Sequence, residues 1–208
     1  LLDLRERDVL AGTILGVNVG KNRDTPLERA AADYVAGMTA VYATADYLTL
    51  NLSSPNTPGL RTLQSGAALG PLLDAVGEAG QALAARHGRR VPVFLKIAPD
   101  LVDADLEIIA AAAADPGVDG FIATNTTIGR PGLAGVPHGA EAGGLSGAPL
   151  RPLALATVAR LRALVGPDVP VIGVGGIGSA ADGAAMLAAG ADLLQIYTGF
   201  IYRGPALV

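Results

Sequence analysis

The sequence predicts an α/β fold, a (β/α)8 TIM barrel of which about six βα units are present in 208 residues. Short apolar runs that are typical of buried parallel strands alternate with Ala- and Leu-rich helical patterns. Polar or glycine clusters follow all six runs, as in a barrel whose strands end at a common cavity. The alternative, an open doubly wound sheet, would concentrate such clusters after one or two strands.

The elements alternate regularly along the chain. We expect strands at residues 13–19, 47–52, 91–97, 120–124, 169–174 and 193–197. We expect helices at residues 26–43, 67–86, 103–114, 152–164 and 180–189, and no helix after the last strand. Thr25, Asp100 and Ser179 precede three of these helices as start signals, and Gly190 is a stop signal.

Six strands cannot close an eight-stranded barrel, so we expect two N-terminal βα units to be missing. The chain begins at Leu1 rather than at a methionine, which also indicates a piece of a longer protein. The even spread of apolar segments favours one domain over residues 1–208.

Composition excludes several classes of function. The net charge is −4 and the basic residues are scattered, which argues against a nucleic-acid groove. The chain has no cysteine, and its two histidines, His87 and His138, lie in connectors, so we expect no metal site. Neither a long apolar run nor a signal peptide is visible, and the chain is expected to be soluble.

The run from Asn51 to Arg61 carries the strongest functional signal. It closes an apolar strand with amides, hydroxyls and a guanidinium, held stiffly by Pro55 and Pro58. A polar βα loop with capping residues is the purely structural alternative, but it would need fewer such groups.

Lys96, near the end of another apolar strand, is a candidate cation for an anionic or electron-rich ligand. The alternative is a lysine whose side chain snorkels out of the barrel end.

Residues 173–179 form a glycine-rich strand-to-helix turn, which suits either a barrel phosphate site or a tight turn without ligand. Residues 124–127 offer three hydroxyls and an amide. The loop 129–147 is either an active-site loop or a surface excursion.

In these motifs the chain resembles the class 2, quinone-dependent dihydroorotate dehydrogenases. The resemblance extends over nearly the whole chain, and the run from Asn51 to Arg61 is its most specific part. It rests on further segments around Asn18 and Lys96 and on residues 123–127, 143–147, 173–177 and 195–200. The absence of cysteine agrees, because class 1 enzymes carry a cysteine base where this chain has Ser54.

The resemblance implies oxidation of dihydroorotate to orotate in pyrimidine biosynthesis, with FMN as cofactor. Ser54 matches the general base that takes the C5 proton while hydride leaves C6 for the flavin, and the proton is then relayed onward. The implied substrate-binding residues are Asn51, Asn56, Asn125 and Thr126. The implied FMN-binding residues are Asn18, Asn51, Lys96, Thr124, Gly147, Gly176, Tyr197 and Thr198. The last four match the phosphate end, where backbone amides rather than cations do most of the binding.

The same resemblance implies quinone as electron acceptor and a peripheral location on the cytoplasmic face of the cell membrane. Both belong to an N-terminal helical hood that this chain does not contain, and no residue here demonstrates them. Two alternatives remain open at this point: a non-catalytic barrel module that binds a phosphate-bearing ligand, and an inactive fragment of an active enzyme.

Overall fold

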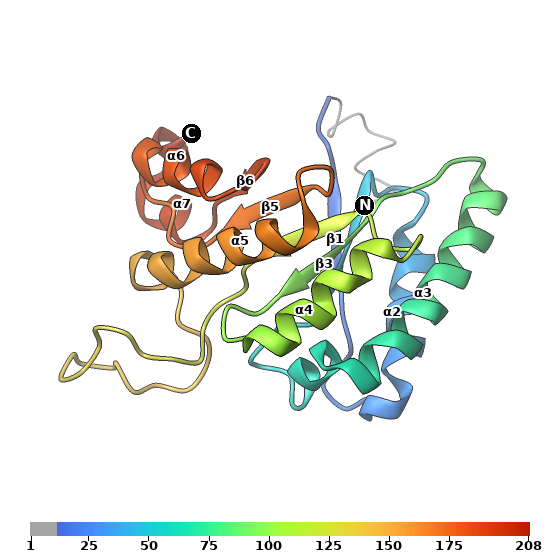
Figure 1. Cartoon of the computed structure of the whole chain (residues 1–208), viewed down its shortest axis with the longest axis horizontal. Helices are drawn as coiled ribbons and strands as arrows, with labels where there is room; N and C mark the ends of the chain where they lie inside the picture. Colours follow the sequence, from blue (N-terminus) through green and yellow to red (C-terminus); the bar gives the residue numbers. More distant parts are fainter. Residues whose placement is uncertain (1–11) are drawn as a thin grey trace.

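The computed structural model describes residues 12–208, whose strands form a six-stranded parallel sheet (Figure 1). The strands are β1 (Gly16–Val19), β2 (Tyr47–Asn51), β3 (Val93–Ile97), β4 (Gly120–Ala123), β5 (Val171–Val174) and β6 (Leu193–Gln195). They are hydrogen-bonded in the order of the sequence, and each neighbouring pair is parallel. Because this order never reverses, the sheet has no topological switch point. The partial barrel is confirmed, and the open-sheet alternative is wrong.

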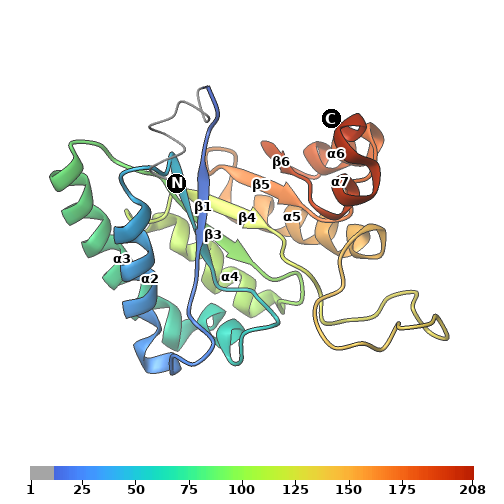
Figure 2. The same cartoon turned by 180° about the vertical axis from the view of Figure 1, so that it is seen from behind.

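Within residues 12–208 one α-helix follows each strand. These helices are α2 (Ala30–Val41), α3 (Gly66–His87), α4 (Asp103–Ala111), α5 (Arg151–Val165), α6 (Ala180–Ala188) and α7 (Thr198–Arg203). In Figure 1 α4 and α5 lie in front of the strands, and in Figure 2, seen from behind, they lie beyond them. Within residues 12–208 no helix combines the length and the apolar character that crossing a bilayer requires.

The core fills the space between the strands and the helices. Leu48 and Leu50 of β2 are completely buried, as are Tyr34 and Met38 of α2. The central strands are buried on both faces, whereas the last strand is not: Leu193 in β6 is 61% exposed. The sheet is therefore best covered in its middle, and its last strand is an exposed edge.

Several local expectations need correction. A helix does follow the last strand: it is the short α7, in which Gly199 lies so close to the Ile177 carbonyl that a Cβ would be 2.2 Å from it. Asp100 and Thr25 do not cap helices, since α4 begins after Val102 and the 3-10 turn at Leu27–Arg29 begins after Pro26, both without side-chain caps.

The start signal at Ser179 is confirmed, because its hydroxyl accepts a hydrogen bond from the Asp182 amide at 3.2 Å. Gly190, with φ of 112°, follows the end of α6 as expected. His87 is not in a connector but is the last residue of α3, where its ring lies 5.5 Å from the ring of Tyr42.

The amino ends of the strands are joined by a contact that recurs three times. An aspartate immediately precedes each of β2, β4 and β6. Its backbone N–H donates to the carbonyl of the residue at the start of β1, β3 or β5, and its carboxylate accepts from the backbone N–H of the same residue. The pairs are Asp46 with Leu15, Asp119 with Val93 and Asp192 with Val171, at 2.7 to 2.8 Å. This edge of the sheet, which we call the amino edge, is thus built from one repeated unit.

Candidate functional site

A cleft of about 360 Å³ lies at the carboxyl ends of the strands, and each strand contributes to it directly or through the loop that follows. Parallel strands bring their carboxyl ends to one edge, so side chains far apart in sequence meet there. Every site residue expected from the sequence lines this cleft: Asn18, Asn51, Ser54, Asn56, Lys96, Thr124, Asn125, Thr126, Gly147, Gly176, Tyr197 and Thr198.

The amides of Asn51 and Asn125 are joined through a serine. The Asn51 side-chain oxygen accepts hydrogen bonds from the amide and the hydroxyl of Ser53, each at 3.2 Å. The Asn125 side-chain nitrogen donates to the Ser53 hydroxyl at 3.1 Å and to the Asn51 oxygen at 3.3 Å. Ser53 is completely buried, and the sequence analysis assigned it no role. It fixes two amides that come from different strands.

Asn51 is also held through its backbone. The Tyr34 hydroxyl in α2 donates to the Asn51 carbonyl at 2.8 Å. Burial raises the pKa of Tyr34, so this hydroxyl keeps its proton and remains a donor. Asn51 is consequently held both at its backbone carbonyl and at its side-chain oxygen.

Ser54 lies in the loop after β2, half-buried and facing the cleft. Its hydroxyl accepts a hydrogen bond from the backbone N–H of Asn56 at 3.3 Å. Among the described residues that line the cleft, the ionisable side chains are Lys96 and Tyr197, and neither is a carboxylate or an imidazole.

Lys96 is half-buried near the end of β3, in register with Asn51 of β2 and Ile122 of β4. Burial lowers the pKa of Lys96. It lines the cleft instead of extending away from it, which argues against the snorkelling alternative. Burial leaves the ammonium group of Lys96 poorly solvated, and an anionic or electron-rich ligand in the cleft would stabilise its charged form.

The glycine turn after β5 leaves room for a ligand and supplies donors. Gly176 has φ of 70°, and a Cβ there would lie 2.9 Å from the Arg151 nitrogen. Within the described part of the chain, the amides of Gly176 and Ile177 have no hydrogen-bond acceptor. Facing them, the Thr198 hydroxyl donates to Ser146 at 2.9 Å. Free amides beside hydroxyls suit the oxygens of a phosphate group.

A second hollow continues outward from this turn towards Arg151 and Arg203. Arg151 forms an ion pair with Asp182. Hydrogen bonds from Ser179 and from the Gly178 amide, together with Arg151 and Arg203, lower the pKa of Asp182. The carboxylate thus offsets part of the positive charge at the outer end of the glycine turn.

The long loop 129–147 combines both alternatives that the sequence left open. Its final part lines the cleft through Gly144, Ser146 and Gly147. Its middle runs away from the body of the molecule as the long yellow excursion of Figure 1, where His138 pairs with Glu141 at 2.6 Å. Arg130 closes its base by donating to the carbonyls of Glu141 and Gly143 at 2.6 and 2.7 Å.

Several contributors were missed from the sequence. Ser146, Gln195 and Ile196 line the cleft, and all three stand in motifs that we had singled out as segments without naming these positions. Tyr197, which was expected from the sequence, lines the cleft although it is 77% exposed. Over residues 12–208 there is no group of three or more His, Cys, Asp or Glu side chains close enough to hold a metal ion.

Comparison with known proteins gives a consistent result. A family model described as dihydroorotate dehydrogenase matches residues 3–208. A Pseudomonas aeruginosa protein named dihydroorotate dehydrogenase (quinone) is 55% identical over 195 residues, which are 94% of this chain and 57% of that protein. A protein of the same name from Verminephrobacter eiseniae is 57% identical over 93% of this chain and 54% of its own length.

Solved structures agree with the sequence relatives. The Eimeria tenella enzyme in complex with ferulenol superposes with a TM-score of 0.87 at 38% identity, covering 98% of this chain and 59% of that one. The ligand-free Eimeria tenella structure gives the same TM-score at 40% identity. The chain thus spans a little over half the length of the relatives it matches.

Proposed function

The chain belongs to the dihydroorotate dehydrogenase family, in its quinone-dependent class 2 branch, and on this basis we propose that it is the catalytic part of an enzyme that oxidises dihydroorotate to orotate. The observation that carries the proposal is that all twelve site residues implied by the resemblance line one cleft. We further propose that residues 1–208 act as one FMN-binding domain, of which residues 1–11 lie outside the described part.

The residues present fit FMN. The cleft has the size of a typical cofactor site. Lys96 supplies a cation for the electron-rich ring, and Asn18, Asn51 and Thr124 supply directional hydrogen-bonding groups around it. The amides of Gly176 and Ile177, with Gly147, Tyr197 and Thr198, would hold the phosphate. The chemistry that FMN supplies when bound is acceptance of a hydride equivalent and delivery of the electrons to quinone.

The other residues position the substrate. Asn51, Asn56, Asn125 and Thr126 offer amides and a hydroxyl to the ring and carboxylate of dihydroorotate. The mutual bonds of Asn51, Ser53 and Asn125 hold these groups in place before binding, so that less freedom is lost when the substrate arrives. Ser54 would receive the C5 proton and release it towards solvent.

We propose quinone as the acceptor and peripheral membrane contact through an N-terminal region of the full protein. The quinone in the names of the relatives supports both, because respiratory-type quinones reside in membranes. The acidic net charge and scattered basic residues give no support to a nucleic-acid partner.

An anaerobic titration of the full-length protein tests the proposal. We expect it to purify with a yellow flavin whose absorbance is bleached by dihydroorotate, with one orotate formed per flavin. Dihydrouracil is the matched control, since it lacks the carboxylate that the amides would hold, and it should bleach the flavin far more slowly. If the protein did not bind FMN, or if dihydroorotate left the bound flavin oxidised, a non-catalytic barrel module that binds a phosphate-bearing ligand would be the better explanation.

A further inference from the structure

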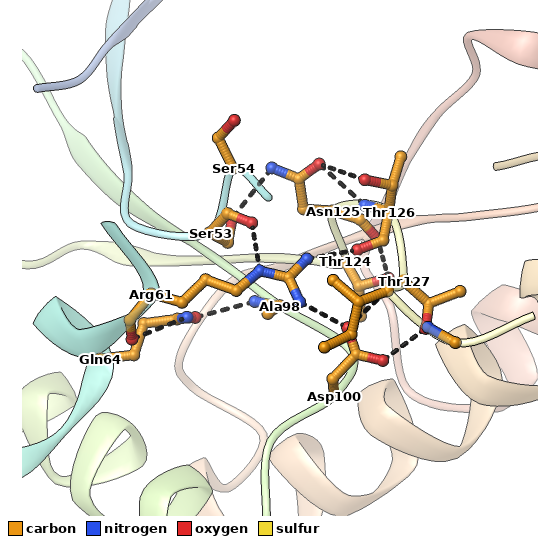
Figure 3. Close-up of polar contacts among 12 residues, drawn as sticks. Ser53, Ser54, Arg61, Gln64, Ala98, Asp100, Thr124, Asn125, Thr126 and Thr127 are labelled. Carbon is orange, nitrogen blue, oxygen red and sulfur yellow. Dashed lines mark hydrogen bonds and ion pairs between the residues drawn. The ribbon is translucent and has the colours of Figure 1, made fainter. Parts of the chain in front are cut away.

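Arg61 stands between the two halves of the candidate substrate site without lining the cleft. Its Nε donates to the Ser53 carbonyl at 3.0 Å, directly before Ser54 in the loop after β2. Another of its nitrogens donates to the Thr126 carbonyl at 2.7 Å, in the segment after β4. Figure 3 shows the guanidinium in the middle of these contacts, with Ser53 on one side and Thr126 and Thr127 on the other.

Asp100, in the segment after β3, holds the remaining side of the guanidinium at 2.6 Å. The same carboxylate accepts a hydrogen bond from the Thr127 hydroxyl, which is buried, and one from the Ile128 amide at 3.1 Å. Arg61 and Asp100 are each about one-fifth exposed. Three consecutive strand ends therefore converge on one ion pair.

We propose that Arg61 is a positioning residue, with Asp100 as its anchor, that sets the separation between the loop of Ser54 and the segment of Asn125 and Thr126. This inference rests on the proposed function. The guanidinium is committed to two backbone carbonyls and a carboxylate, so it acts on those segments and not on the ligand. An error of about 1 Å between reacting groups can cost about a hundredfold in rate.

Only arginine can perform this task. Its planar group presents donors in fixed, divergent directions, one to each strand end, whereas a lysine ammonium concentrates its donors at one point. Arg61→Lys would keep the charge near Asp100 and lose at least one carbonyl bond. The variant therefore separates charge from geometry.

The chain offers a matched control at the amino edge of the sheet. Arg162 donates to the carbonyls of Gly190, Val169 and Gly166 at 2.8, 2.9 and 2.5 Å and pairs with Asp192 at 2.5 Å. It makes the same kinds of contact, with similar exposure of its side chain, but its partners lie at the amino ends of β5 and β6, away from the cleft.

The experiment uses the full-length FMN-loaded protein and its Arg61→Lys and Arg162→Lys variants. For Arg61→Lys we expect the limiting rate of flavin bleaching at saturating dihydroorotate to fall about a hundredfold, with unchanged FMN content. We expect amide hydrogen exchange in residues 53–57 and 125–129 to accelerate about tenfold, while residues 175–178 keep their protection. Arg162→Lys should lower the unfolding temperature and leave the bleaching rate and both segments unchanged.

Asp100→Asn provides a milder second variant, which keeps both carbonyl bonds of Arg61 and should slow bleaching by about tenfold. Wild-type bleaching by Arg61→Lys, or unchanged exchange in either segment, would overturn the positioning role. If the wild-type protein itself is not bleached, the proposed function fails, and the exchange measurement still decides whether Arg61 holds the two segments together.

Discussion

The two edges of this sheet use similar polar groups in different ways. At the amino edge an aspartate repeats before β2, β4 and β6, each time with the same reciprocal pair of bonds to the neighbouring strand. At the carboxyl edge the strand ends carry several kinds of group: β2 leads into an amide and hydroxyl array, β3 carries a lysine, and β5 leads into glycines.

The difference has a physical cause. At the amino edge each contact solves the same problem, which is to satisfy the first amide of a strand and fix its register, so one solution recurs. At the carboxyl edge each strand end must meet a different part of a ligand. Repetition therefore marks the edge that stabilises the sheet, and variety marks the edge that binds. Four substitutions can break or sharpen this contrast.

The largest effect is expected at Ser54. Ser54→Ala removes the proposed proton acceptor and should slow flavin bleaching by dihydroorotate about 10²- to 10⁴-fold near neutral pH, with FMN retained. Stopped-flow absorbance on the full-length protein measures the rate, and Ser65→Ala, an exposed hydroxyl outside the cleft, is the control. Bleaching at the wild-type rate would exclude Ser54 as the base. A large fall in unfolding temperature would show that this edge also carries stability.

The largest effect on stability is expected at Asp119. Asp119→Ala removes the acceptor of the Val93 amide, a hydrogen bond to a charged group that is worth about 1.5–3 kcal/mol. It also removes the partner of Arg90, whose side chain is 58% exposed, so that this ion pair adds little. We expect the free energy of unfolding, measured by urea denaturation, to fall by about that amount. The bleaching rate should stay constant. Asp168→Ala, at an exposed position, should change neither quantity, and a slower reaction in Asp119→Ala would break the separation between the edges.

A smaller effect on cofactor affinity is expected at Gly176. In Gly176→Ala the added Cβ would press on Arg151, and a non-glycine residue at this positive φ costs about 1–2 kcal/mol. The turn should shift and carry its amides away from the phosphate, weakening FMN binding about tenfold as measured by fluorescence titration. Gly70→Ala, in α3 with open space around it, is the control and should bind FMN normally. Equal affinity in both variants would argue against a phosphate at this turn.

The smallest effect concerns the charge of Lys96. Because burial lowers its pKa, the folded apoprotein binds fewer protons there than the unfolded chain in the pH range just below 10.5. The contribution of Lys96 to the free energy of unfolding therefore rises with pH through that range. At lower pH Lys96 is protonated in both states, and the full cost of burying its charge remains. Urea denaturation of apoprotein should show that the difference in stability between wild type and Lys96→Met changes in wild type's favour as pH rises. A pH-independent difference would mean that Lys96 is not desolvated.

Much of the site could be found from sequence because its members stand at strand ends. Strand and helix patterns placed Asn18, Lys96 and Thr124 at equivalent positions, and the barrel rule then brings them to one edge. The roles of Ser53 and Arg61 could not be found in this way. Ser53 is buried and Arg61 lies outside the cleft, and both act through bonds to segments more than 60 positions away in the sequence.

Local signals also failed where tertiary contacts compete with them. Asp100 looks like a helix start signal, yet the ion pair with Arg61 takes its carboxylate. The helix α7 has no periodic pattern, and the close approach of Gly199 to Ile177 is part of what fixes it. In both places a contact distant in sequence outweighs the local propensity.

The sequence by itself determined the alternation of strands and helices, and hence the parallel partial barrel and the edge at which its polar groups gather, because hydrophobic period and strand direction are local properties. Only the tertiary structure decided which groups are fixed by which partners. The reciprocal aspartate bonds of the amino edge, the Ser53 link between two amides and the Arg61 clamp all join separate βα units. Their geometry depends on how those units pack, and no single segment encodes it.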